Sequence, residues 1–171
     1  MDIQNVLSEL SKQLPAEGSV RELYICGGAA LNLLGISSRQ TADIDVLAPE
    51  IDQTLKTAAD KVAVELGLEQ GWLNNGPIDL LQNLHAEWKT GATLVFDSPK
   101  LKVFSLGRMD LLKSKVWAAC DRLEDIPDVV AMTPTEQELD QVRDWVLECD
   151  ASDIWPEIVN QCLEEIKRRL N

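Results

Sequence analysis

The stretch that most constrains the fold is residues 24–49, YICGGAALNLLGISSRQTADIDVLAP. It begins with a short apolar run that is typical of a buried strand, and Gly27 and Gly28 then interrupt that run. A helical pattern follows and ends at another glycine. After a polar loop the chain continues as Asp43-Ile-Asp45-Val-Leu, which predicts a second strand. The stretch therefore predicts a strand, a Gly-Gly turn, a helix and a second strand in close succession.

Asp43 and Asp45 are predicted to point to the same face of a sheet, because side chains alternate along a strand. Carboxylate oxygens suit Mg²⁺, and this ion usually keeps phosphate oxygens among its ligands. Glycines at the start of a helix bring backbone N–H groups close to a phosphate, because they carry no side chain that would block the approach. Gly27 and Gly28 with the two aspartates therefore predict a magnesium–phosphate site. The structural alternatives are a solvated strand face and a turn needed only for packing.

This order of motifs resembles the DNA polymerase beta-type nucleotidyltransferase superfamily. The segment GGAALNLLG…SRQTADIDVL is most similar to its small bacterial branch of uncharacterised domains related to abortive-infection (toxin–antitoxin) nucleotidyltransferases. The resemblance implies an α+β, minimal nucleotidyltransferase fold with a small mixed sheet, helices packed on one face and a helical C-terminal part. It also implies Mg-dependent transfer of a nucleotidyl group from an NTP to a hydroxyl acceptor. Asp43 and Asp45 would then be catalytic and hold one or two magnesium ions, with the NTP as substrate.

The resemblance extends to residues before and after the aspartate pair. Arg39 and Thr41 are expected to bind the nucleotide, since a guanidinium can grip a phosphate with its planar fork. Arg39 could equally pair with a surface acid. In the resembled family a third carboxylate completes the metal site. Asp97 is our candidate for this third metal ligand, and Asp79 is the alternative.

A later segment, Asp110 to Asp128, resembles a second motif of the toxin-like branch. By position Lys115 matches a helix-borne lysine that is proposed to contact the triphosphate, so it is a candidate catalytic residue. Asp125 and Asp128 match the acids of that motif. The alternative is the charged, solvated surface of an amphipathic helix.

The length of 171 residues predicts a single nucleotidyltransferase-like domain over residues 1–171. Its core is expected over residues 20–106 and its helical C-terminal part over residues 108–171. The expected elements outside the central stretch are a first helix capped by Asp2, a helix from Pro49 to Gly67, a short helix within 78–88, strands at 93–96 and 101–104, and helices that begin near 110, 135 and 156.

The net charge of −13 argues against partners with a phosphate backbone. We do not expect duplex nucleic acid as a partner, because its binding is driven largely by basic surface. A nucleotide, a cognate antitoxin and an acceptor protein are the partners that we expect. No apolar run approaches the roughly 20 residues of a membrane span, and the start lacks a secretory signal, so we expect a cytoplasmic protein without membrane contact. The four cysteines form no C-x-x-C pair and are expected to be reduced.

Two other interpretations differ in function. Many superfamily relatives carry Gly-Ser at the turn, whereas here Gly28 is followed by Ala29, and the third acid is unassigned. Both points favour a catalytically inactive nucleotidyltransferase-fold protein that binds a nucleotide or a protein. A dinucleotide-binding Rossmann fold is a poor match because G-x-G-x-x-G is absent. Among the five tryptophans, Trp72 in its turn-rich segment is the candidate for stacking on a base.

Overall fold

The computed structural model describes residues 1–16 and 18–170. The chain divides into two compact units, residues 1–107 and residues 108–171. The first unit contains a five-stranded sheet with helices, and the second is helical. The predicted α+β fold class is therefore confirmed. No helix within these described ranges is long and apolar enough to cross a membrane.

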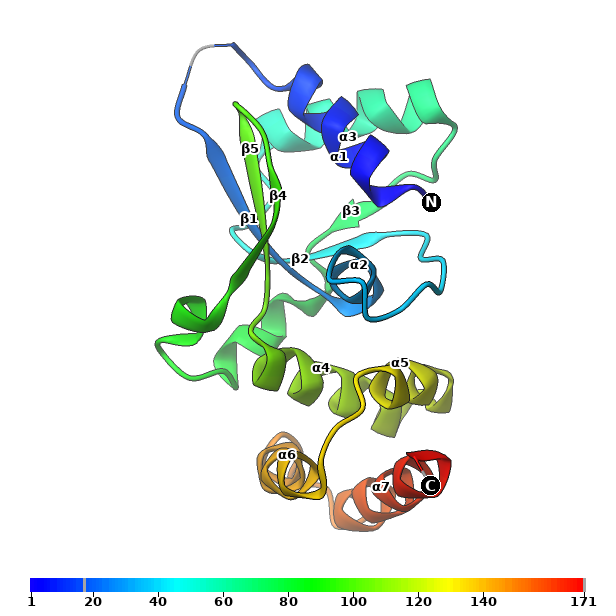
Figure 1. Cartoon of the computed structure of the whole chain (residues 1–171). Coiled ribbons are helices and arrows are strands. Elements are labelled where there is room, and N and C mark those ends of the chain that lie inside the picture. The colour runs from blue at the N-terminus through cyan, green and yellow to red at the C-terminus, as the bar shows by residue number, and fades with distance from the viewer. Residues whose placement is uncertain (17, 171) are drawn as a thin grey trace. The chain divides into compact units, whose positions relative to one another are not determined.

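The sheet of the first unit is mixed (Figure 1). Its strands in chain order are β1 (Arg21–Cys26), β2 (Ile44–Ala48), β3 (Leu73–Asn74), β4 (Thr93–Asp97) and β5 (Leu101–Ser105). Their spatial order is β3-β2-β1-β5-β4. The central strand β1 runs antiparallel to β2 and parallel to β5. The two strands predicted near residues 93–96 and 101–104 are β4 and β5, which pair as antiparallel neighbours.

The two faces of the sheet differ in burial. Along β5 the side chains alternate between buried and partly exposed, and β1 does so from Glu22 to Ile25, whereas Cys26 after it is also buried. Fully buried side chains gather on one face, and from the three central strands they are Leu23, Ile25, Ile44, Val46, Leu101 and Val103. The opposite face carries Tyr24 and Phe104, which are neighbours across β1 and β5 and only half-buried.

Three helices complete the core of the first unit: α1 (Ile3–Gln13), α2 (Gly27–Leu33) and α3 (Gln53–Leu66). Helix α1 packs against α3, and α2 contacts β1 and β2 (Figure 1). The Asp2 side chain accepts a hydrogen bond from the backbone N–H of Asn5 at 3.1 Å, so the predicted cap of the first helix is confirmed.

Helix α3 begins four residues later than Pro49, where we predicted its start. Its first residue is Gln53, because the Asp52 side chain caps the helix by accepting from the Leu55 N–H at 2.8 Å. The predicted end at Gly67 is confirmed, and that glycine adopts a left-handed conformation (φ +66°).

The segment between β2 and α3 is held by one side-chain amide. The Nδ2 group of Asn75 donates to Val46 O at 2.8 Å and to Pro49 O at 3.2 Å. Its Oδ1 atom accepts from the Ile51 N–H at 2.7 Å. Asn75 therefore fixes the connection between β2 and α3 through three backbone groups.

The segment before β4 differs from the single short helix that we predicted within 78–88. It forms two 3-10 helices, η1 (Gly76–Gln82) and η2 (Trp88–Gly91). Pro77 has non-helical dihedral angles inside η1, which prevents a regular α-helix there. The two-residue strand β3 was expected as part of a turn, and Trp72, which precedes it, is 2% exposed and donates from its indole to Ala59 O. Trp72 is therefore a core residue and does not offer a face to a base.

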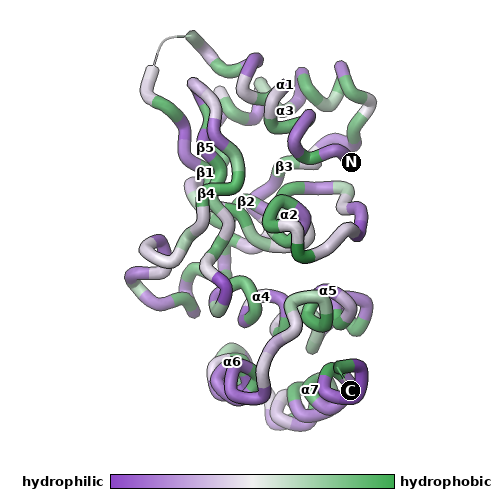
Figure 2. The backbone as a smooth tube through the Cα atoms, viewed as in Figure 1, coloured by the Kyte–Doolittle hydropathy of each residue, from purple (hydrophilic) through white to green (hydrophobic). Residues whose placement is uncertain are grey.

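The second unit contains α4 (Arg108–Asp121), η3 (Leu123–Asp125), α5 (Ile126–Ala131), α6 (Glu136–Glu148) and α7 (Trp155–Leu170). Hydrophobic and hydrophilic residues alternate along α6 and α7 (Figure 2), as expected for helices with one buried stripe. Helix α5 carries a proline, Pro127, near its start. It lies in the first turn of α5, a position where proline is tolerated because its missing N–H is not needed there.

A Thr-x-x-Glu pattern predicts a capping box at Thr133 and Glu136 with Pro134 as the first helical residue, but the structure has the box two residues later, because α6 begins at Glu136. Thr135 Oγ1 accepts from the Glu138 N–H at 3.2 Å, and the Glu138 carboxylate accepts from the Thr135 N–H at 2.8 Å. Arg108 also donates to Glu138 at 2.8 Å. The hydrogen bond from Arg108, followed by the bond from the Thr135 backbone, lowers the pKa of Glu138 to about 2.

This lowered pKa predicts a pH dependence of stability. A carboxylate with a folded-state pKa below its unfolded-state value of about 4.3 stabilises the fold above that value, and loses the contribution as pH falls toward 2. We expect Glu138→Gln to lower the free energy of unfolding at pH 7 by about 1 kcal/mol, with a smaller difference from wild type near pH 2. Urea midpoints measured between pH 7 and pH 2 test this. Glu136→Gln in the same helical turn is the control, and an equal effect of the two changes would contradict the assignment.

Candidate functional site

The turn between β1 and α2 brings Asp45 against Gly27. Gly27 has a φ of +72°, and a Cβ atom added there would overlap the carboxylate of Asp45. In the sheet Asp45 pairs with Cys26, the residue that precedes this glycine. A glycine at position 27 is therefore required both by the left-handed backbone and by the closeness of the Asp45 side chain.

The second glycine of the turn lies beside Thr41. A Cβ atom at Gly28 would meet Thr41 Cβ and Oγ1 at 3.4 Å. The Thr41 hydroxyl donates to Asp43 Oδ1 at 3.1 Å, which fixes the orientation of that carboxylate. The structure thus brings the two predicted glycines, Thr41, Asp43 and Asp45 together at one end of β1. The glycines make room for side chains of this site, a role that the sequence pattern alone did not indicate.

Sequence reasoning missed Asn74 as a neighbour of the site. Asn74 pairs with Asp45 across β2 and β3, and its Oδ1 accepts from the Gly76 N–H at 2.7 Å. The Asn-Asn-Gly sequence indicated a turn, and nothing in its composition indicated that the turn begins with a strand beside Asp45.

The oxygen donors at this end of β1 fit a magnesium ion that arrives with a nucleotide. Mg²⁺ is commonly held by one or two protein carboxylates together with phosphate oxygens, and Asp43 and Asp45 supply two carboxylates. A magnesium site made of protein ligands alone would need more than these two carboxylates. Among the described residues, no group of three or more His, Cys, Asp or Glu side chains could hold a metal ion. Asp79, the alternative candidate for a third carboxylate, is exposed in η1 and belongs to no such group.

The structure does not bring Asp97, the first candidate for a third carboxylate, to the pair. Asp97 is opposite Lys102 on β5, and Lys102 is opposite Glu22 on β1. Glu22 lies four residues before Cys26, the partner of Asp45. At about 3.3 Å per residue, Asp97 is therefore about 13 Å away along the strand direction, and three strands away across the sheet. The strand pairing places it near the opposite end of the sheet.

The remaining predicted residues have different surroundings. Arg39 is exposed in the loop before Thr41, and its backbone N–H donates to Ser37 Oγ. Lys115 is 6% exposed in the second unit. Its Nζ donates to Asp128 Oδ2 at 2.6 Å and to Asp125 Oδ1 at 3.2 Å, so the three later-motif residues form one buried ionic cluster.

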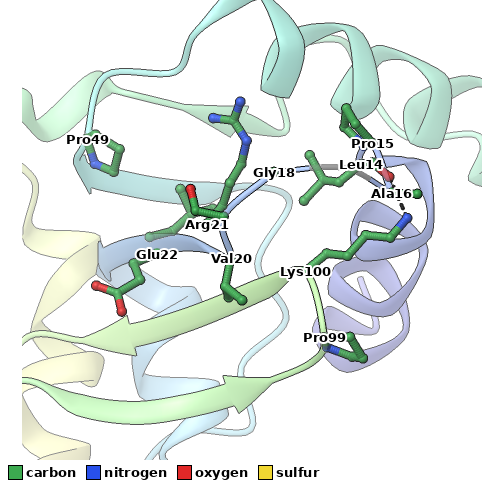
Figure 3. Close-up of a pocket in the computed structure, with 12 residues that line it drawn as sticks. Leu14, Pro15, Ala16, Gly18, Val20, Arg21, Glu22, Pro49, Pro99 and Lys100 are labelled. Atoms are coloured by element: carbon green, nitrogen blue, oxygen red, sulfur yellow. Dashed lines mark hydrogen bonds between the residues drawn. The ribbon is translucent and has the colours of Figure 1, made fainter.

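A pocket of about 350 Å³ lies at the other end of β1 (Figure 3). Lys100 reaches from the β4–β5 turn to the end of α1, where its Nζ donates to Leu14 O at 2.6 Å. Arg21, the other cation of the pocket, pairs with Asp52 at 2.7 Å. Because this pocket contains none of the aspartates or glycines discussed above, and its cations have structural partners, we do not place the functional site there.

The five-stranded mixed sheet with its helices is consistent with a small nucleotidyltransferase-like fold. Residues 2–155 match the family described as "Nucleotidyltransferase of unknown function (DUF6036)", and the chain therefore belongs to this family. The predicted membership of the nucleotidyltransferase superfamily is supported by this match. No curated protein and no solved structure matches the chain.

Proposed function

We propose that this protein is a magnesium-dependent nucleotidyltransferase that moves a nucleotidyl group from an NTP to a hydroxyl acceptor. The observation that carries the proposal is the closeness of the Asp45 carboxylate to Gly27, with Asp43 two residues away and fixed by Thr41. Paired carboxylates beside a glycine turn are suited to a metal–triphosphate ligand.

Each residue of the site would have a separate role in holding the metal ion and the nucleotide. Asp43 and Asp45 would hold the magnesium ion, and the Thr41 hydroxyl would keep Asp43 oriented toward it. Gly27 and Gly28 would allow the loop of residues 41–45 to lie close to the turn. A bound magnesium ion supplies charge neutralisation for the triphosphate and orientation of the reacting oxygens.

The acceptor that we propose is a hydroxyl group on a protein side chain or a small molecule. The net charge of −13 would repel duplex nucleic acid, so a nucleic-acid acceptor is the weaker choice. A toxin–antitoxin or phage-defence setting, with a cognate antitoxin as partner, is a proposal by analogy with the resembled branch.

A second candidate function is a catalytically inactive nucleotide-binding or protein-binding module. The specific observation in its favour is that no group of three or more His, Cys, Asp or Glu side chains among the described residues could hold a metal ion, so no third carboxylate joins Asp43 and Asp45. An assay of pyrophosphate release distinguishes the two functions. An active enzyme releases pyrophosphate from a bound NTP when an acceptor is present, whereas a binding module holds the NTP and releases none.

The first test is calorimetric titration of ATP, GTP, CTP and UTP in the presence and absence of Mg²⁺. We expect at least one NTP to bind in a magnesium-dependent way. Asp45→Asn and Asp43→Asn should each weaken that binding by about 100-fold, because an amide lacks the charge that attracts the metal. Asparagine keeps the size of the side chain, and at position 43 it can still accept from Thr41.

Asp97→Asn and Asp79→Asn are the matched controls for this titration, and both should leave the affinity unchanged. Magnesium-dependent binding that survives both changes at positions 43 and 45 would rule out the proposed site. The absence of binding of any NTP by the folded wild type would rule out the proposed function.

A further inference from the structure

An aromatic cluster lies on the less buried face of the sheet, the face that carries Tyr24 and Phe104. Tyr24 of β1 and Phe104 of β5 are stacked with their ring centroids 5.1 Å apart at an interplanar angle of 17°. Trp88 of η2 meets Tyr24 edge-on at 5.2 Å and 84°. These three side chains are half-buried, whereas the hydrophobic side chains on the other face of β1 are fully buried. The cluster therefore presents aromatic surface outside the core.

A cation already lies over this aromatic surface. Lys89 Nζ is 4.8 Å from the centroid of the Tyr24 ring and 5.4 Å from a ring centroid of Trp88. Lys89 is exposed, so its flexible side chain can exchange this position with solvent or with a ligand. The Tyr24 and Trp88 side chains are themselves only half-buried, so part of each is accessible to solvent.

The distance from the aromatic cluster to Asp45 is comparable to the length of one nucleotide. Tyr24 and Cys26 lie on the same face of β1, since they are two residues apart, and Cys26 pairs with Asp45. Two residues of a strand span about 7 Å. A nucleotide with its phosphates at Asp45 would thus have its base near Tyr24. Burial, followed by the nearby Glu22 carboxylate, raises the pKa of the Tyr24 phenol, which keeps its ring uncharged.

We infer that the surface formed by Tyr24 and Trp88 is the subsite on which the base of the donor nucleotide stacks, with Lys89 displaced from the rings. This inference rests on the proposed function. Aromatic faces bind bases by stacking, and such stacking tolerates every base because each has a π-face. The displaced ammonium of Lys89 gives the site a positive charge for the phosphates in a chain that is otherwise acidic.

The test compares ATP with inorganic triphosphate, which has no base, each titrated calorimetrically with Mg²⁺. Trp88→Leu should weaken ATP binding by about 10- to 100-fold and leave triphosphate binding unchanged. Trp88→Phe, which keeps an aromatic ring, should bind ATP with nearly the wild-type affinity. Equal losses for ATP and triphosphate, or no loss for ATP, would overturn the subsite. If the folded wild type binds neither ligand, the proposed function fails and the subsite fails with it.

A second measurement covers the case in which Trp88→Leu does not fold. ATP should quench the tryptophan fluorescence of the wild type, and most of that quenching should be lost in Trp88→Phe, because the stacked indole is absent. Wild-type quenching that persists in Trp88→Phe would show that the base lies elsewhere. Triphosphate should give no quenching in either protein.

Discussion

Lys115→Met is expected to lower the free energy of unfolding by about 3–5 kcal/mol, the largest stability loss that we predict. Lys115 lies between Asp125 and Asp128, and all three are buried. Removing Lys115 takes a hydrogen-bonded cation away from two buried carboxylates, which costs far more than the ion pairs contribute net, although Asp125 keeps its pair with Arg122 at 3.1 Å. Chemical denaturation of the full chain measures the loss.

Two further variants separate this structural role from a role at the triphosphate. Lys113→Met on the same helix is the matched control, because Lys113 is more exposed and pairs with Asp110 at 3.3 Å. We expect it to cost at most about 1 kcal/mol. The triple change Lys115→Met, Asp125→Asn and Asp128→Asn should recover part of the lost stability, since it also removes the two buried negative charges that Lys115 balances. A Lys115→Met protein with wild-type stability and no NTP binding would instead support contact with the triphosphate.

Gly27→Ala is expected to abolish magnesium-dependent NTP binding and to destabilise the fold by about 1–3 kcal/mol. Part of the loss arises because an L-residue with φ near +72° is strained by roughly 1–2 kcal/mol. The rest arises because the new Cβ overlaps the Asp45 carboxylate, which must move away from the turn. Calorimetric titration with NTP and Mg²⁺, together with a urea midpoint, measures both effects.

Gly35→Ala separates the two causes. Gly35 follows α2 with φ +70°, and no other part of the described chain lies within 4 Å of the Cβ that alanine would add. It should therefore carry the backbone strain alone and keep NTP binding. Equal binding losses at positions 27 and 35 would show that displacement of Asp45 is not the cause.

The parts of the site that could be predicted from the sequence lie within one continuous segment. Gly27, Gly28, Thr41, Asp43 and Asp45 are close along the chain, and a strand, a helix and an adjacent strand bring them together. Period-two and helical patterns specify such local elements well. The α+β fold class and the positions of most elements followed from the same patterns.

The parts that could not be predicted depend on pairing between distant segments. The place of Asp97 depends on the strand register of β4, β5 and β1, and sequence patterns do not determine that register. The neighbour of Asp45 on β3 belongs to a strand of only two residues, which is too short for a recognisable period. The partners of Lys115 follow from how η3 and α5 fold back on α4, which helical periodicity does not indicate.

The three hydrogen bonds of the Asn75 side-chain amide also bear on the chemical ageing of the chain. Asn75 precedes Gly76, and an Asn-Gly sequence readily loses ammonia when the glycine nitrogen attacks the side-chain amide. In the fold that nitrogen donates to Asn74 Oδ1, while the Asn75 amide bonds three backbone groups. Both reacting groups are engaged elsewhere, so the rate of this damage is set by how often the segment opens. The same bonds that connect β2 to α3 thus protect the chain's covalent structure.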